Sequence, residues 1–157
     1  MAATTMQLTK LVQKLQSDFP ALTFMAADDF LWSSEKKTIY YAPEKHAQIL
    51  LLHELGHALC AHTDFAFDIE LLSQEREAWE IVRRILAEKY TVQLDDELIE
   101  DSLDTYRDWL HKRALCPSCG LTGLQTKTST YVCANCRCSW RPNDARRCAL
   151  RRYTATV

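Results

Sequence analysis

Apolar side chains recur every three or four residues in four segments of the chain, which is the spacing of a helix with a buried face. The predicted helices cover about residues 5–18, 43–62, 70–90 and 95–113. The second is apolar on nearly every side, so we expect it to be buried. Pro43 and Glu44 are typical of a first helical turn, because proline lacks an N–H that would be unpaired there and glutamate complements the helix dipole.

Three short segments have the composition of strands instead. Residues 23–25, 30–32 and 38–41 contain β-branched and aromatic side chains, and the polar run 33–37 is typical of a turn between the last two. We expect them to form a short antiparallel sheet. The exposed strand at 38–41 would then be available to hold an extended peptide by strand addition.

One pentapeptide in the second helix carries the most specific chemistry. Residues 53–57 read HELGH, so His53 and His57 lie one turn apart on the same face, with Glu54 beside them. Two imidazoles at this spacing can hold one zinc ion, and a catalytic zinc site uses three protein ligands and a water. Glu54 is the expected general base, and a third protein ligand is required.

The third ligand is sought among the residues that follow. His62 lies five residues after His57, which would turn it about 140° away on a continuing helix, so we expect it to flank the helix end. In the next predicted helix, Glu75 falls within the apolar stripe, three residues before Ala78. An acid on a buried face requires a cation, which favours Glu75 as the ligand. Glu77, on the polar side, is the alternative.

HELGH together with EREA at residues 75–78 resembles the ImmA/IrrE family of small zinc metallopeptidases, and residues 38–41 are similar to that family's strand before the active-site helix. The resemblance spans about residues 20–90. It implies three zinc ligands and a general base, namely His53, His57, Glu75 and Glu54. It also implies cleavage of a cytoplasmic protein such as a DNA-binding regulator. The family pattern continues after EA with a small polar residue and a Phe-Ala pair, whereas this chain has Trp79 and Glu80.

A second metal site is predicted near the C-terminus. Two CxxC pairs are separated by thirteen residues, a spacing at which four thiolates close a structural zinc site on a hairpin. The expected ligands are Cys116, Cys119, Cys133 and Cys136. Cys138 is the alternative to Cys136. Gly120 stands where the turn of a zinc knuckle needs positive φ. The odd total of seven cysteines and the absence of an apolar run at the N-terminus favour zinc over disulfides.

The expected fold class is therefore α+β. A zincin-type metallopeptidase domain covers residues 1–113, a zinc ribbon 114–140 and a basic tail 141–157. The metallopeptidase domain would bind a catalytic zinc ion and the ribbon a structural one. No segment is predicted to span a membrane, and we expect a cytoplasmic protein.

Charge divides unequally along the chain. Residues 64–108 carry a net charge of -9 and residues 109–157 a net charge of +8, against -2 for the whole chain. The tail interleaves arginines with two aromatic residues, a composition suited to phosphate contacts and base stacking. These residues are Arg137, Arg141, Arg146, Arg147, Arg151, Arg152, Trp140 and Tyr153. A solvated tail or an intramolecular contact explains the composition equally well.

Two other functions are compatible with the sequence. One is a protease similar to the SprT/Spartan group, which acts on proteins attached to DNA; that group's additional histidine ligand is not evident here. The other is a non-catalytic regulator in which the ribbon binds nucleic acid and HELGH is structural. The presence of Glu54 argues against the second, because a metal site without catalysis needs no general base.

Overall fold

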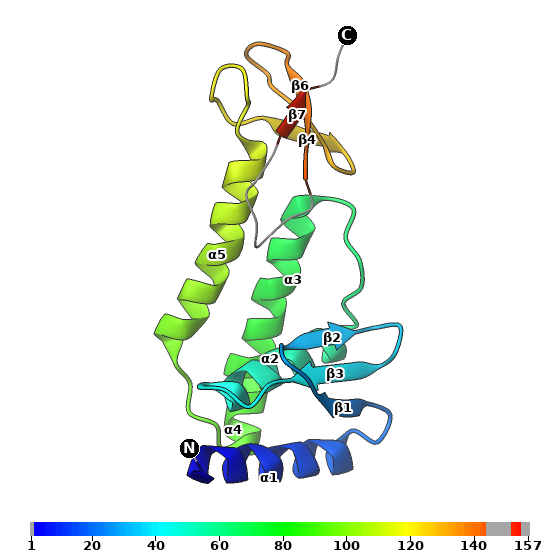
Figure 1. Ribbon diagram of the computed structural model, residues 1–157, viewed down its shortest axis with the longest axis vertical. Coiled ribbons are helices and arrows are strands. Elements are labelled where there is room, and N and C mark those ends of the chain that lie inside the picture. Colours follow the sequence, from blue (N-terminus) through cyan, green and yellow to red (C-terminus); the bar gives the residue numbers. More distant parts are fainter. Residues whose placement is uncertain (1, 144–151, 155–157) are drawn as a thin grey trace. The chain divides into compact units, whose positions relative to one another are not determined.

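The computed structural model describes residues 2–143 and 152–154, with side chains from Met6 onward (Figure 1). Its fold is mixed α+β, as predicted, with two small sheets. The chain divides into two compact units. The N-terminal unit comprises Met1–Thr63 and Gln74–Asp96, and the C-terminal unit comprises Asp64–Ser73 and Glu97–Val157. The three-part division expected from the sequence stays a prediction.

The elements follow in the order of the chain. The helical segments are α1 (Ala2–Asp18), α2 (Ala47–Leu59), α3 (Asp68–Ile81), η1 (Val82–Leu86), α4 (Ala87–Tyr90) and α5 (Asp96–Ala114). The strands are β1 (Thr23–Ala26), β2 (Leu31–Ser33), β3 (Thr38–Tyr41), β4 (Leu124–Lys127), β5 (Thr130–Val132), β6 (Ser139–Pro142) and β7 (Arg152–Thr154). Among the described helices, none combines the length and the apolar character needed to cross a membrane.

The sheet of the N-terminal unit is mixed, with the order β1-β3-β2. β2 and β3 form the expected antiparallel hairpin, but β1 pairs with β3 in parallel, so the prediction of an antiparallel sheet was wrong for that pair. β3 takes the centre because it carries the buried residues Thr38 and Ile39. Both edges of β3 are consequently paired, and the edge strands are β1 and β2.

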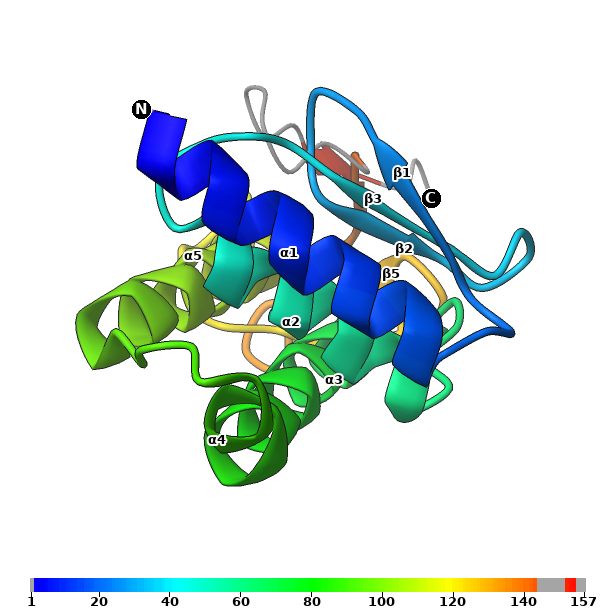
Figure 2. The same ribbon diagram turned by 90° about the horizontal axis from the view of Figure 1, so that it is seen from below.

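Helix α2 begins four residues later than predicted. Pro43 and Glu44 lie in bends before the helix, and His46 precedes it with a left-handed backbone, φ 66°. A residue with positive φ interrupts helical geometry, so the first regular turn forms only from Ala47. The helix is otherwise buried as expected, in contact with α1, β2, β3 and η1, and Figure 2 shows α1 lying across it.

The helix predicted over residues 70–90 contains a wider turn that the apolar spacing did not reveal. η1 is a π-helical segment, in which the N–H of Ala87 donates to the carbonyl of Val82, five residues earlier. The wider turn changes which side chains face the core: Val82, Leu86 and Ala87 are buried, whereas Ile85 is 53% exposed. Ile85 therefore lies outside the buried face, although its apolar spacing matches that of Ala78 and Val82.

Helices α2 and α3 approach each other closely at Gly56. A Cβ atom placed on Gly56 would lie 2.6 Å from the carbonyl oxygen of Ala78 and 3.1 Å from its Cα. Both neighbours are backbone atoms, which cannot rotate away as a side chain can. The glycine of HELGH is therefore required by the packing of α3 against α2.

Gly56→Ala is expected to destabilise the protein by roughly 1–3 kcal/mol, because the added methyl group overpacks this contact. Helix propensity alone acts in the opposite direction by about 1 kcal/mol. Urea unfolding of Gly56→Ala and of Leu59→Ala, a control at a position of α2 that is 45% exposed, measures the difference. A Gly56→Ala protein at least as stable as the wild type would contradict this account of the contact.

In the C-terminal unit, β4 to β7 form a sheet in sequence order, and all the pairs are antiparallel. Trp140 of β6 lies fully buried at its centre, stacked on Tyr131 with 5.6 Å between ring centroids. Gly123 makes room for this indole, since a Cβ there would come within 2.3 Å of it. Trp140 Nε1–H also donates to the carbonyl of Arg113 at the end of α5.

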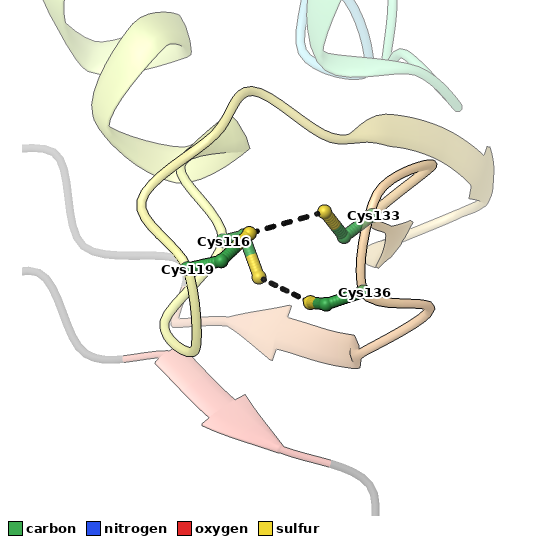
Figure 3. Close-up of side chains that lie close together, drawn as sticks. All are labelled: Cys116, Cys119, Cys133 and Cys136. Carbon is green, nitrogen blue, oxygen red and sulfur yellow. Dashed lines mark hydrogen bonds between the residues drawn. The ribbon is translucent and has the colours of Figure 1, made fainter.

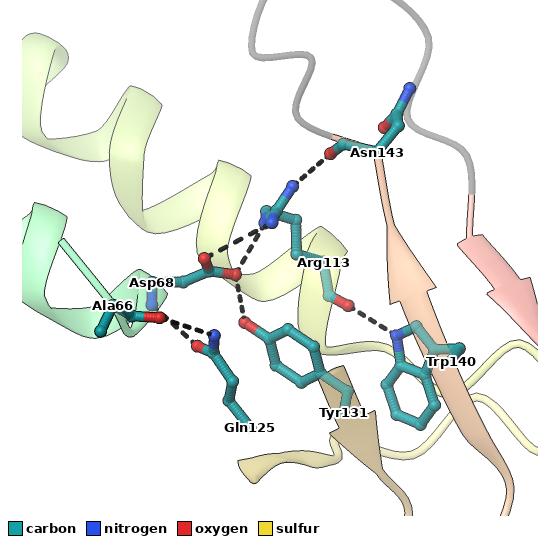
Figure 4. Close-up of polar contacts among 7 residues, drawn as sticks. All are labelled: Ala66, Asp68, Arg113, Gln125, Tyr131, Trp140 and Asn143. Carbon is teal, nitrogen blue, oxygen red and sulfur yellow. Dashed lines mark hydrogen bonds and ion pairs between the residues drawn. The ribbon is translucent and has the colours of Figure 1, made fainter. Parts of the chain in front are cut away.

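A buried ion pair joins the first turn of α3 to α5 and the sheet (Figure 4). The Nε of Arg113 donates to Asp68 Oδ2 over 2.7 Å, and the hydroxyl of Tyr131 donates to the same oxygen over 2.5 Å. The Asp68 N–H donates to the Gln125 side chain, and Arg113 also donates to the Asn143 carbonyl. Each buried charge is thus compensated by several partners, as burial of an ion pair requires.

Asp68→Ala is expected to destabilise the C-terminal unit by about 3–5 kcal/mol, because it leaves the Arg113 guanidinium buried without its counter-charge. Tyr131→Phe removes a single hydrogen bond to a charged group and should cost about 1.5–3 kcal/mol. Thermal unfolding measures both. Asp104→Ala serves as the control, since it removes an exposed partner of Arg107 on the same helix α5. Equal losses of stability in Asp68→Ala and Asp104→Ala would show that the buried ion pair stabilises the unit no more than an exposed one.

Candidate metal centres

The structure brings His53, His57 and Glu75 together in the N-terminal unit. Glu75 Oε2 lies 3.0 Å from His53 Nε2 and 3.5 Å from His57 Nε2, and the two nitrogens lie 3.1 Å apart. Four ligands placed tetrahedrally around zinc at its usual distances stand about 3.3 Å apart. The three atoms therefore already have the spacing of ligands that share one ion, and the group could hold a metal.

Burial makes a cation at this point favourable. All three side chains are buried, and an uncompensated carboxylate would be costly there. Burial raises the pKa of Glu75, but hydrogen bonds from His53 and His57 outweigh it and lower that pKa to about 2. Burial lowers the pKa of His57, but its hydrogen bond to Glu75 and the nearby carboxylates raise it overall. The site is thus arranged to keep a carboxylate ionised beside a positive charge.

Glu54 follows His53 on α2 and lies beside this group. Burial raises the pKa of its carboxyl group, against the opposing effect of His53 and His57, and the negative charge of Glu75 raises it further. The backbone N–H of Trp32, on the edge strand β2, donates to the Glu54 carboxylate. A carboxyl group whose pKa is raised is better suited to accept and return a proton than one that stays ionised.

Trp79 packs directly on the first histidine. Its ring stacks on His53 with 4.1 Å between centroids and an interplanar angle of 23°. This is the position at which the sequence departs from the pattern of the ImmA/IrrE family. The departure places a large flat side chain against a candidate ligand, where it limits rotation of the His53 ring.

Glu77 and His62 form a separate pair next to the group of His53, His57 and Glu75. His62 Nε2 lies 3.2 Å from Glu77 Oε2, and it is Glu75, not Glu77, whose carboxylate converges with His53 and His57. His62 returns to the site because α2 ends at Leu59 and Ala61 adopts a left-handed backbone, φ 54°. The N–H groups of Ala61 and His62 donate back to the last turn, which closes the helix. His62 therefore flanks the helix end, as predicted. Because the helix does not continue, its side chain points back towards His57.

The four cysteines of the predicted ribbon converge at one end of the second sheet (Figure 3). The sulfur atoms of Cys116 and Cys136 lie 3.5 Å apart, as do those of Cys119 and Cys133. Tetrahedral thiolates around zinc stand about 3.8 Å apart, so the cluster needs little adjustment to hold an ion. No disulfide joins any of the described cysteines.

Two similar turns present these sulfur atoms. The N–H of Gly120 donates to the Cys116 carbonyl, and the N–H of Arg137 donates to the Cys133 carbonyl. Gly120 has φ 75°, as predicted, and Arg137 has φ 62° in the equivalent position. Burial raises the pKa of Cys116, but backbone N–H groups of Cys119 and Ser118 outweigh it and lower that pKa to about 6. A thiol with a lowered pKa is readily converted to the thiolate that binds metal.

Cys138 does not belong to the group of four. Its sulfur lies near the carbonyl of Ser139, and its own carbonyl accepts from the N–H of Cys133. Cys136 is the residue whose sulfur completes the cluster. C136S therefore tests the ligand assignment, and C138S is its matched control.

C136S is expected to bind about one zinc ion fewer per chain than the wild type, because three thiolates hold a structural ion poorly. C138S should retain the wild-type zinc content. Inductively coupled plasma mass spectrometry on the purified proteins gives the numbers. A loss of zinc in C138S with none in C136S would reverse the assignment.

The aromatic residues of the basic region are placed differently from one another. Trp140 is 0% exposed and packs in the core of the ribbon, so the expectation that it could stack on a nucleic-acid base was wrong. Tyr153 of β7 is 57% exposed, and Arg152 beside it donates to the Leu115 carbonyl. Four residues of interest lie outside the described residues: Arg146, Arg147, Cys148 and Arg151.

Comparisons with known proteins identify no relative: no protein-family model matches the chain, and no curated protein or solved structure matches it either. The two candidate metal centres are therefore the features of this chain that point to a function.

Proposed function

We propose that this protein is a zinc-dependent endopeptidase that uses the His53, His57 and Glu75 group as its catalytic metal site. The observation that carries the proposal is the convergence of three buried ligand atoms within 3.5 Å of one another, with the Glu54 carboxyl group beside them. A structural site would fill all four positions with protein ligands. Three ligands and an adjacent acid are typical of a site that activates water.

In this proposal each residue has a defined task. His53, His57 and Glu75 would hold zinc, which when bound lowers the pKa of a water molecule and polarises a peptide carbonyl. The Glu54 carboxylate would accept a proton from the attacking water and return it to the leaving amine. The four cysteines would hold a second, structural zinc ion that keeps the ribbon folded.

Binding of a peptide substrate by strand addition requires an unpaired strand edge beside Glu54. The sequence pointed to residues 38–41 for this role, but these residues form the central strand β3, whose two edges are paired with β1 and β2. β2 is an edge strand, and its Trp32 N–H contacts Glu54. We therefore assign strand addition to β2 in place of β3.

The resemblance to the ImmA/IrrE family supports a cytoplasmic protein substrate, such as a DNA-binding transcriptional regulator. The ribbon and the basic residues after it are then suited to recognise the substrate or the nucleic acid on which it sits. Cleavage that requires DNA would favour the SprT/Spartan type of activity instead.

The test combines zinc content with proteolysis. The wild type should bind two zinc ions per chain; E54Q should keep both and lose cleavage, because only the general base is changed; and E75A should keep about one. Each protein is assayed against candidate regulators with and without DNA. E80A is the control, since Glu80 pairs with Arg84 on the outside of the same helix. Full zinc retention in E75A, or undiminished cleavage by E54Q, would overturn the proposal.

A further inference from the structure

A line of hydrogen bonds leads from the candidate metal site to the protein surface. His57 Nδ1 lies 2.8 Å from His62 Nδ1, and His62 Nε2 lies 3.2 Å from Glu77 Oε2. His57 and His62 are buried, whereas the Glu77 side chain is 54% exposed. Neither His62 nor Glu77 belongs to the three ligands described above.

The protons in this line can be placed by counting donors. A neutral imidazole carries one N–H and one lone pair. If His57 binds the metal through Nε2, its only proton is on Nδ1, and it donates to His62 Nδ1. The remaining proton of His62 is then on Nε2, which donates to the Glu77 carboxylate. Every donor in the line meets an acceptor.

We propose that His62 and Glu77 are positioning residues that hold His57 in its metal-binding tautomer and orientation. This inference rests on the proposed function of the HELGH site. Partners of this kind on a metal-bound imidazole raise its basicity, and their loss typically weakens metal binding about 10–100-fold. The described residues supply no equivalent partner to His53, whose buried Nδ1 has no hydrogen bond. His57 is thus the ligand whose geometry the protein controls by hydrogen bonding, while stacking on Trp79 holds His53.

The backbone around His62 is built to keep this side chain in place. Its N–H donates to the His57 carbonyl over 3.0 Å, and its carbonyl accepts from the Trp32 indole over 3.1 Å. The left-handed Ala61 makes this return possible without a glycine. Both backbone groups of His62 are therefore anchored within the same unit as the site.

A different use of these residues competes with the proposal. Ligand atoms of Cys60, His62 and Glu77 lie within 4.8 Å of one another and could hold a metal of their own. A metal on His62 Nε2 would move the His62 proton to Nδ1. His57 Nδ1 would then have to accept, and His57 Nε2 would carry the proton that excludes it from the first site. Metal ions on the Nε2 atoms of both rings would require a proton on each Nδ1, but the short contact between the two Nδ1 atoms has room for only one proton. The two uses therefore exclude each other.

The experiment measures zinc affinity by competition with a chelator, and imidazole tautomers by ¹⁵N NMR of histidine-labelled protein. H62A should bind the HELGH-site zinc about 10–100-fold more weakly, and E77A should show a smaller loss. C60S and E80A should match the wild type. In zinc-loaded wild-type protein, His57 should be the Nδ1–H tautomer and His62 the Nε2–H tautomer.

The outcomes separate the two proposals. A wild type that binds no zinc at HELGH refutes the proposed function, whatever His62 does. A wild type that binds it, with H62A and E77A both unchanged, refutes only the positioning role. A further zinc ion lost in C60S would assign Cys60, His62 and Glu77 to a metal site of their own and overturn the inference. E77A, changed at an exposed position, keeps the test valid if H62A fails to fold.

Discussion

The close contact of α2 with α3 at Gly56 and Ala78 is the constraint on which the candidate active site depends. His53 lies three residues before Gly56, and Glu75 lies three residues before Ala78. One turn from the contact point along each helix, the two side chains meet, with 3.0 Å between Nε2 and Oε2. A larger residue at position 56 would separate the helix axes and increase this distance, so the glycine determines whether three ligands can share one ion.

The protein buries polar groups in two ways that differ in what they require. In the C-terminal unit, Asp68, Arg113 and Tyr131 compensate one another, and the cluster is complete without any ion. In the N-terminal unit, two imidazole nitrogens and a carboxylate oxygen converge on one point, and the charges there are balanced when a cation is shared. The first arrangement stabilises a fold, while the second is suited to binding a metal.

Much of the site could be predicted from local spacing, because His53 and His57 lie four residues apart and Glu75 falls in an apolar stripe. The same holds for the CxxC pairs, for Gly120 and for the extent of most helices. The parallel pairing of β1 with β3, the wider turn of η1 and the left-handed Ala61 could not be predicted. Each depends on contacts between distant residues or on backbone strain that tertiary packing compensates. Ala61 matters most here, since its left-handed backbone turns the chain at the end of α2 and makes His62 a neighbour of His57.

We propose that one chain holds two zinc ions, one bound by four sulfurs and one by two histidines and Glu75. X-ray absorption at the zinc edge of the fully loaded wild type tests this most directly, because it reports the average surroundings of both ions. The expected result is about two sulfurs near 2.3 Å and about two nitrogen or oxygen ligands near 2.0 Å per zinc, with the outer scattering of imidazole. A first shell of four sulfurs alone, with no imidazole contribution, would contradict it.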